Sequence, residues 1–219
     1  VYSDQRSIDL LTGLTGVYES RSPFSIPGDS RDSSDCVWRI SLDGRQVGKW
    51  LPNQSTTSQF RPWSLSVTSR RLLVTSYTND LLLYGPDGVE LKRVPLPDTL
   101  TSLQHAVETS RGTFIVSHRE PQPRVCEANV DGQVTLVYCD QQQLSAPVYL
   151  TLDSDGRIFV ADYNKHRVLL LNSETLELER VLLDKQQHQL IVPRRLCYTQ
   201  HTGQLAVCGS VYDVSTGRW

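Results

Sequence analysis

Residues 157–172, RIFVADYNKHRVLLLN, contain two apolar runs that flank the polar segment 162–167. Short apolar runs bounded by polar residues are typical of strands that are buried on both faces. The segment between the runs begins with Asp162, whose carboxylate can accept hydrogen bonds from nearby backbone amides. The stretch therefore predicts two buried strands joined by a sharp polar corner.

The same pattern recurs along the chain with a period of about 44 residues. Asp43, Asp87 and Asp131 are each followed by glycine and stand 44 residues apart, and residues 174–175 and 216–217 continue the series at slightly shorter spacings. An Asp-Gly pair between alternating apolar residues is a strong hairpin signal, because both residues tolerate positive φ. A fixed period of this length predicts repeated structural units.

Each repeat contains four short strands, which are called a, b, c and d in chain order. In the second repeat they are expected at 63–68, 71–77, 80–85 and 89–96. Strands b and c are the most apolar, which predicts that neighbouring units cover both of their faces. Residues 180–190 are the only helix candidate, and strand d followed by a polar loop is the favoured interpretation there.

Four-stranded antiparallel units repeated every 40 to 45 residues are typical of an all-β fold, the β-propeller, in which each unit is one blade. The blades are expected at residues 7–52, 60–97, 101–139, 146–183 and 193–219 of a single domain. A five-bladed ring is one interpretation, with residues 1–5 supplying the last strand of the fifth blade. The alternative is a six-bladed ring of which part is missing.

Charge and composition narrow the classes of partner. The chain has 219 residues, 22 Lys plus Arg and 24 Asp plus Glu, and a net charge of −2. A protein that neutralises many phosphates usually carries a basic surplus, so no DNA partner is expected. No apolar run approaches the roughly 20 residues that a bilayer-spanning helix needs, so no membrane partner is expected. The absence of Met and the start at Val1 suggest a domain of a longer protein.

Five cysteines occur without any Cys-x-x-Cys pair, so a zinc-finger site is not expected. Reduced thiols that fill small apolar spaces are the simplest interpretation. Cys197 and Cys208 are expected to face each other across a hairpin of the fifth blade, with their redox state left open. Reduced thiols favour the cytoplasm, and an extracellular location stays open.

Residues 146–172 resemble an NHL repeat, the repeat that also occurs in TRIM-NHL proteins. The resemblance rests on a proline, an Asp-Gly turn, a Val-Ala-Asp strand end and an Asn-x-His-Arg segment, here Pro147, Asp155, Gly156, Val160, Asp162, Asn164, His166 and Arg167. Residues 60–88 match more loosely, and the third and fifth repeats keep only the strand rhythm. The resemblance implies a propeller, often of six blades, that binds RNA or protein. Similar folds also serve lyases and lactonases.

Two kinds of site follow from the strand pattern. Asp162 and Arg167 are expected to be structural, with Asp162 accepting loop amides and Arg167 bridging to the next blade. The ends of strand b form a series of equivalent positions near the channel mouth, Glu19, Ser76, His118, Asp162 and Gly209. Glu19, His118 and Asp162 are weak candidates for a metal or an acid–base pair. Neither a catalytic centre nor a cofactor is expected, because no phosphate loop, HExxH or GxSxG motif occurs.

The favoured function is binding through one face of the ring, the face that carries the b–c corners and the d–a connections (the loop face). Arginine and aromatic residues dominate the binding hot spots of proteins, and they also stack on unpaired bases. A protein or peptide partner is favoured over single-stranded RNA because the chain is nearly neutral. The candidate loop-face residues are Arg61, Tyr77, His118, Arg119, Tyr163, Lys165, His166, Arg194 and Arg195. A metal-dependent lyase or hydrolase at the channel mouth is the remaining alternative.

Overall fold

The computed structural model describes residues 37–40, 45, 47–51, 62–68, 71–76, 78–138 and 144–211. Within them lie sixteen strands and one helical turn. The first sheet contains β1 (Val37–Ile40) and β2 (Val47–Leu51), and the last contains β15 (Leu190–Thr199) and β16 (Gln204–Val211). The three sheets between them have four strands each and follow the order a, b, c, d predicted from the repeat.

The strands of the four-stranded sheets are consecutive in the chain and antiparallel. The second blade comprises β3 (Pro62–Val67), β4 (Leu72–Ser76), β5 (Asp80–Tyr84) and β6 (Glu90–Pro95). The third comprises β7 (Thr101–Glu108), β8 (Phe114–Glu120), β9 (Arg124–Ala128) and β10 (Val134–Tyr138). The fourth comprises β11 (Pro147–Leu152), β12 (Ile158–Asp162), β13 (Arg167–Leu171) and β14 (Leu178–Leu183).

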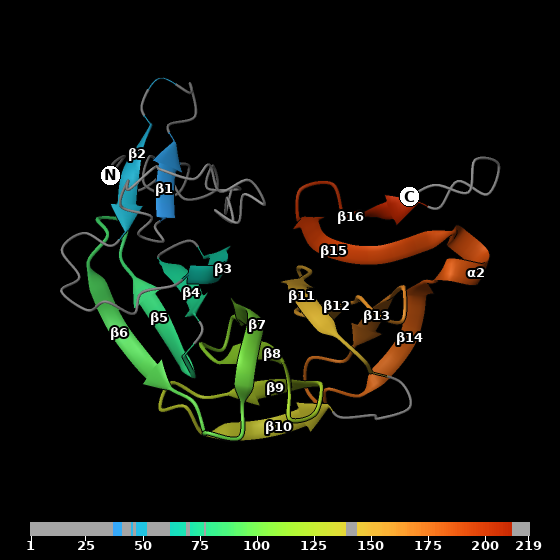
Figure 1. The fold of residues 1–219 in the computed structure, drawn as a ribbon, viewed down its shortest axis with the longest axis horizontal. Helices are drawn as coiled ribbons and strands as arrows, with labels where there is room; N and C mark the ends of the chain where they lie inside the picture. The colour runs from blue at the N-terminus through green and yellow to red at the C-terminus, as the bar shows by residue number, and fades with distance from the viewer. Residues whose placement is uncertain are drawn as a thin grey trace, which may run out of the picture.

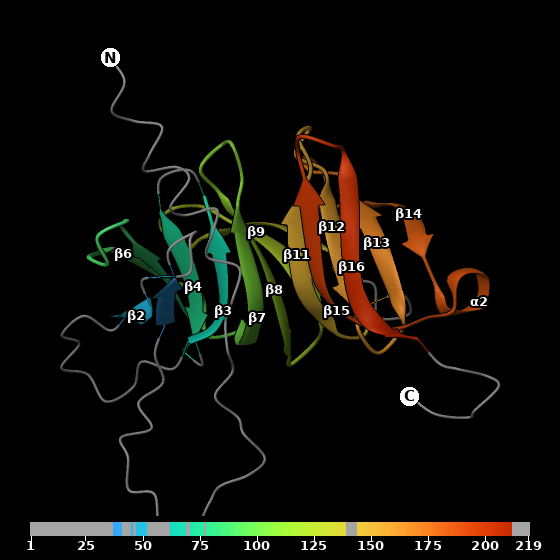
Figure 2. The same ribbon diagram turned by 90° about the horizontal axis from the view of Figure 1, so that it is seen from above.

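The sheets are arranged around a common centre as blades of a β-propeller (Figure 1). Strands β3, β7 and β11 are innermost, and β6, β10 and β14 are outermost. Seen from above, the inner strands β3, β7, β11 and β15 follow one another side by side in chain order (Figure 2). The loops at one end of these strands therefore come together from several blades.

Both faces of the middle strands are buried, as their apolar sequences predict. Every residue of β4 and of β12 is buried. Successive side chains of a strand point to opposite faces, so each strand contributes to two different cores. In β12, Ile158 and Val160 pack toward the third blade, whereas Phe159 and Ala161 pack toward the fifth.

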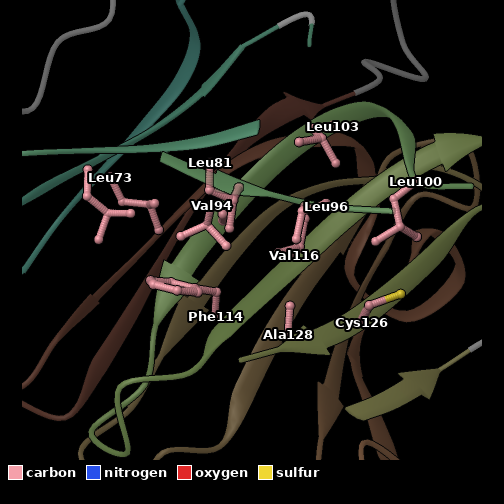
Figure 3. Close-up of a cluster of buried hydrophobic side chains, with 12 residues drawn as sticks. Leu73, Leu81, Val94, Leu96, Leu100, Leu103, Phe114, Val116, Cys126 and Ala128 are labelled. Atoms are coloured by element: carbon pink, nitrogen blue, oxygen red, sulfur yellow. The ribbon is translucent and has the colours of Figure 1, made fainter. Parts of the chain in front are cut away.

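Each apolar cluster among the described residues lies between two neighbouring sheets rather than inside one. The cluster in Figure 3 joins Leu73, Leu81 and Val94 of the second blade to Phe114 and Val116 of the third. Three further clusters join the first and second, the third and fourth, and the fourth and fifth sheets. A single sheet could not bury both faces, so the radial arrangement supplies the core.

Polar contacts add further links between blades. Arg71 in the a–b turn of the second blade pairs with Glu108 of the third. Arg111 of the third blade bonds both Glu127 in its own sheet and the carbonyl oxygen of Ser173 in the fourth, at 2.8 and 3.0 Å. Arg111 is therefore shared between two blades.

The predicted Asp-Gly hairpins form with a different turn from the one expected. Gly88 and Gly132 have positive φ, 83° and 82°, whereas neither Asp87 nor Asp131 does. Gly88 donates to the carbonyl of Gly85, and Gly85 donates to the carbonyl of Val89. Such a loop ends in a left-handed glycine and needs only one residue with positive φ.

Two other local expectations can be compared with the structure. Residues 180–190 form the end of β14 and then a single helical turn, α2 (Lys185–His188), which Asp184 caps by accepting from the amide of Gln187 at 2.6 Å. Cys197 pairs with Ala206 and Cys208 with Arg195, so the expectation that the two cysteines face each other is wrong by two residues of register. Both thiols are free and exposed.

No helix within the described residues is long and apolar enough to cross a bilayer. The first two strands expected in the first blade, and the strand expected from residues 1–5, lie outside the described residues. The same holds for most of the third strand expected in the fifth blade.

Candidate functional site

The b–c corner of the fourth blade is organised by the buried carboxylate of Asp162. Its Oδ1 accepts from the amides of Ser145 and Ala146 at 3.2 and 2.8 Å. Its Oδ2 accepts from Nε and a terminal nitrogen of Arg167, at 3.2 and 3.1 Å. Asp162 has no exposed surface, so its charge is balanced entirely within the corner.

Arg167 has a different partner from the one expected. It was expected to bridge to the next blade, but its guanidinium pairs with Asp162 of the adjacent strand. The reason is the register: Asp162 lies directly opposite Arg167 in the β12–β13 ladder. Opposed residues on one face of a sheet are about 5 Å apart at Cβ, within reach of such a pair.

The strand-b ends occupy equivalent places in their sheets. Ser76, His118 and Asp162 lie opposite Pro62, Leu103 and Pro147, each just before a bulge in the inner strand. In the fifth blade Cys208 pairs with Arg195 as Ala161 pairs with Tyr149, which places Gly209 in the series. Glu19 lies outside the described residues.

These equivalent positions do not gather ligands for a cation in the part of the chain that the structure describes. No group of three or more His, Cys, Asp or Glu residues comes together there. Asp162 already accepts four hydrogen bonds, and the Ser76 hydroxyl bonds Thr78 at 2.7 Å. The side chains of Asp162 and Ser76 are therefore used within their own corners.

His118, which was expected on the loop face, is buried in the corner of the third blade. Its Nδ1 lies 3.0 Å from the carbonyl oxygen of Glu120, and because that oxygen can only accept, Nδ1 carries the proton. Burial lowers the pKa of His118, the Glu120 carbonyl raises it and the nearby Arg124 lowers it. Its Nε2 is buried and has no hydrogen-bond partner.

The other described candidates lie in the b–c corners and on strand β15. Arg119 is exposed at the end of β8, and Lys165 is exposed in the corner of the fourth blade. Tyr163 and His166 are half-buried in the same corner. Arg194 and Arg195 are exposed on β15. Arg61 and Tyr77 lie outside the described residues.

The structure brings four of these candidates together between the fourth and fifth blades. The guanidinium carbon of Arg194 lies 5.7 Å from the centre of the Tyr163 ring, which is a cation–π contact. The Nδ1 of His166 accepts from the amide of Val192 at 3.1 Å. Lys165 lies between Tyr163 and His166 in the same corner. The b–c corner of the fourth blade thus contacts β15, the first strand of the fifth blade.

Arg195 continues a ladder of rings along the inner strands. Its guanidinium carbon lies 5.2 Å from the centre of the Tyr149 ring. Tyr149 in turn stacks on His105, and these two residues and Arg195 come from β11, β7 and β15. Burial raises the pKa of Tyr149, whereas Arg195 lowers it and Cys197 raises it.

Tyr149, His105 and Arg124 were not selected from the sequence. Aligning the inner strands on their bulges would have placed Ser64, His105, Tyr149 and Arg195 at one equivalent position. Aligning the starts of strand c would likewise have paired Arg124 with His118, as Arg167 is paired with Asp162. These positions could have been found by aligning the repeats, but the alignment requires the pairing register of strands a, b and c.

Comparison with known proteins agrees with the fold. Residues 144–169 match the model of a family described as NHL repeat. No curated protein matches the chain in sequence. The chain is similar in structure to a chain of the crystal structure of a nidogen/laminin complex, with a TM-score of 0.61 and 21% identity over 80% of this chain.

Enzymes are also among the similar structures. A streptogramin B lyase structure has a TM-score of 0.57 and 14% identity over 85% of this chain and 68% of its own. A catalytically inactive virginiamycin B lyase from Staphylococcus aureus with quinupristin has a TM-score of 0.58 and 14% identity, over 80% and 63%. The chain spans 64% of the matched chain of the nidogen/laminin complex. These similarities show the fold alone.

Proposed function

Since this chain is a β-propeller with an NHL repeat at residues 144–169, we propose that it is a binding module that holds a protein or peptide partner on its loop face. The proposal rests on one observation above the others. The guanidinium of Arg194 lies over the ring of Tyr163 across the junction of the fourth and fifth blades, and both residues reach the surface. Arginine and tyrosine are the residue types that most often dominate binding energy.

The stacking matters because it positions the arginine before any partner arrives. A free arginine side chain loses about 2 kcal/mol of rotamer entropy when it is fixed. A cation–π contact with a tyrosine ring does not use the N–H groups of the guanidinium as hydrogen-bond donors, so they can still donate to a carboxylate or carbonyl group. Arg195 on Tyr149 repeats the arrangement at the adjacent position.

Charge supports a protein partner rather than RNA. The chain carries a net charge of −2. The described part of the loop face contains acidic residues, such as Glu120 and Asp184, beside the basic Arg119, Lys165 and Arg194. Binding to nucleic acid depends mainly on phosphate neutralisation, which requires a larger basic surplus. A lyase function has no comparable support, since the resemblance to lyases concerns the fold.

A capture experiment with matched variants tests the proposal. The protein is immobilised and incubated with cell extract, and bound protein and bound RNA are both identified. The variant combines Tyr163→Ala with Arg194→Ala, and the control is Arg180→Ala on the exposed outer strand β14. We expect a defined set of proteins to bind the wild type and the control and to be lost from the double variant.

Two results would contradict the proposal. Recovery of the same proteins with the double variant would show that the loop face is not the binding surface. Binding that disappears after nuclease treatment would indicate RNA as the direct partner. Substitution of Arg119 and Tyr163 together, which removes an exposed and a half-buried side chain from two neighbouring corners, is expected to weaken binding in the same way without unfolding the protein.

A further inference from the structure

The b–c corners of the third and fourth blades are built on the same register but are not equally complete. In the fourth blade Asp162 lies opposite Arg167, and in the third His118 lies opposite Arg124. The Nε of Arg167 donates to the Asp162 carboxylate at 3.2 Å. The third blade has an imidazole in place of this carboxylate, so its arginine has no acidic partner opposite.

Two buried nitrogen atoms are left without partners as a result. The Nε of Arg124 has no hydrogen-bond acceptor, and the Nε2 of His118 has no partner either. Arg124 uses a terminal nitrogen to bond the side-chain oxygen of Gln122 at 3.0 Å, but it pairs with no carboxylate among the described residues. A buried polar atom without a partner costs about 1 to 3 kcal/mol, so two of them side by side require an explanation.

The chemistry of the two atoms is defined by their other contacts. Because Nδ1 of His118 donates to the Glu120 carbonyl, Nε2 of the neutral ring is a lone-pair acceptor. The Nε of Arg124 is always a donor, and its guanidinium carries a positive charge. The missing partner therefore offers one oxygen that accepts from Arg124 and a second atom that can share a proton with His118.

We propose that the corner of the third blade is a binding site for a carboxylate group, which takes the place that Asp162 fills in the fourth blade. One carboxylate oxygen accepts from Nε of Arg124. The other shares one proton with Nε2 of His118, and that proton comes from solvent. Binding therefore takes up one proton, and the carboxylate lies against Nε of Arg124 as Asp162 lies against Nε of Arg167.

An acidic side chain of the protein partner is the source of this carboxylate, a step that rests on the proposed function. The corner belongs to the loop face, where exposed Arg119 and Pro121 flank the buried pair. A partner that docks on Tyr163 of the fourth blade and Arg194 of the fifth would reach this corner along the same loop face. The charged groups of the corner are Arg119, Glu120 and Arg124, and Arg124 is the one that lowers the pKa of His118.

Formate, the smallest carboxylate, tests the site without any partner. Thermal unfolding of the whole chain is followed at pH 6, 7 and 8 in sodium formate and in sodium chloride of equal ionic strength. We expect formate to raise the Tm above the chloride value. Because binding takes up one proton, the affinity for formate should fall about tenfold for each unit by which the pH rises. The imidazole resonances of His118 should shift on addition of formate, and the shift should be largest at pH 6 and smallest at pH 8.

Three variants separate the site from general salt effects. His118→Asp introduces into the third blade the aspartate–arginine pair that the fourth blade has, so it should remove the formate response. Arg124→Gln removes the charge and should also remove it, whereas Arg119→Ala, an exposed neighbour, should keep it. His118→Asp and Arg124→Gln change different members of the pair, so a folding defect in one variant leaves the other as a test.

Equal Tm values in formate and chloride for the wild type would overturn the proposal. So would a formate response that survives both His118→Asp and Arg124→Gln, or one that does not depend on pH. Formate binding is measured on the isolated chain, so its failure is distinct from failure of the capture experiment. If formate binds but the wild-type protein captures no partner protein, only the proposed protein partner is refuted.

Discussion

The imidazole of His105 stacks on the phenol ring of Tyr149, with ring centroids 3.8 Å apart and an interplanar angle of 29°. His105 also lies between two backbones. Its Nε2 is 3.2 Å from the carbonyl oxygen of Leu65, and its Nδ1 accepts from the amide of Leu150 at 3.4 Å. One side chain on β7 therefore bonds the inner strands β3 and β11, and it links three consecutive blades beside the axis of the propeller.

These bonds define the state of the ring. Nε2 must donate to the carbonyl and Nδ1 must accept from the amide, so His105 is neutral with its proton on Nε2. Protonation of Nδ1 would remove the acceptor for Leu150. Burial lowers the pKa of His105 to about 3, with the Leu65 carbonyl raising it and Arg195 lowering it. Charging His105 therefore breaks its hydrogen bond to Leu150 of the neighbouring blade.

The stability of the protein is expected to fall in acid because of His105. In the unfolded chain a histidine has a pKa of about 6.5, so below that pH the unfolded state binds a proton that the folded state excludes. The free energy of unfolding should decrease as the pH falls from about 6.5 toward 3, by about 1.4 kcal/mol per pH unit for this group. The lowered pKa of His118 acts in the same direction.

Urea unfolding between pH 7 and pH 4 measures this dependence. His105→Gln, which cannot be protonated, should be less stable at pH 7 but should lose less stability on acidification than the wild type. The exposed His201→Gln is the matched control and should follow the wild-type curve. A His105→Gln curve parallel to that of the wild type would show that His105 is not the group responsible.

Replacement of Asp162 by alanine should destabilise the protein strongly. It would leave the amides of Ser145 and Ala146 and the largely buried guanidinium of Arg167 without this acceptor. Removal of one partner from a buried ion pair costs about 3 to 5 kcal/mol. Asp162→Asn keeps an oxygen for the amides and should cost less. An unchanged Tm for Asp162→Ala would contradict the role of this corner in holding the fourth blade.

Gly132 should tolerate alanine much less well than Gly112 does. Both have positive φ, 82° and 77°, so both substitutions carry the same backbone strain of about 1 kcal/mol. A Cβ at Gly132 would overlap the carbonyl oxygen of Pro95 in the preceding blade, whereas one at Gly112 meets nothing within 4 Å. Comparison of the two free energies of unfolding isolates the contact between blades. Equal losses would show that this approach is not rigid.

Much of the fold could be predicted from local patterns. The Asp-Gly series, the apolar strands b and c and the polar corner at Asp162 each depend on residues close in the chain, and their physical meaning is local: positive φ, burial on both faces, and capping of backbone amides. The pairing of Asp162 with Arg167 was missed because its partner depends on the register across the corner. The turn type differed because a single left-handed glycine suffices for these loops.

The candidate site depended more heavily on the tertiary arrangement. Types of residue at the strand ends were evident from the repeat, but exposure was not: His118 aligns with Asp162 and is buried, while the adjacent Arg119 is exposed. The stacking of Arg194 on Tyr163 joins residues that are 31 positions apart and belong to different blades. Such contacts arise from packing one sheet on the next, which no period within a single repeat describes.

Repeated four-stranded sheets with buried middle strands follow from the amino-acid sequence, because strand patterns and turns are local and their 44-residue period can be read along the chain. The contacts between the sheets, such as that of His105 with Tyr149, and the lack of a carboxylate opposite Arg124 become visible only in the folded chain. These contacts depend on the relative placement of whole blades, and that placement is set by the apolar clusters that the blades share.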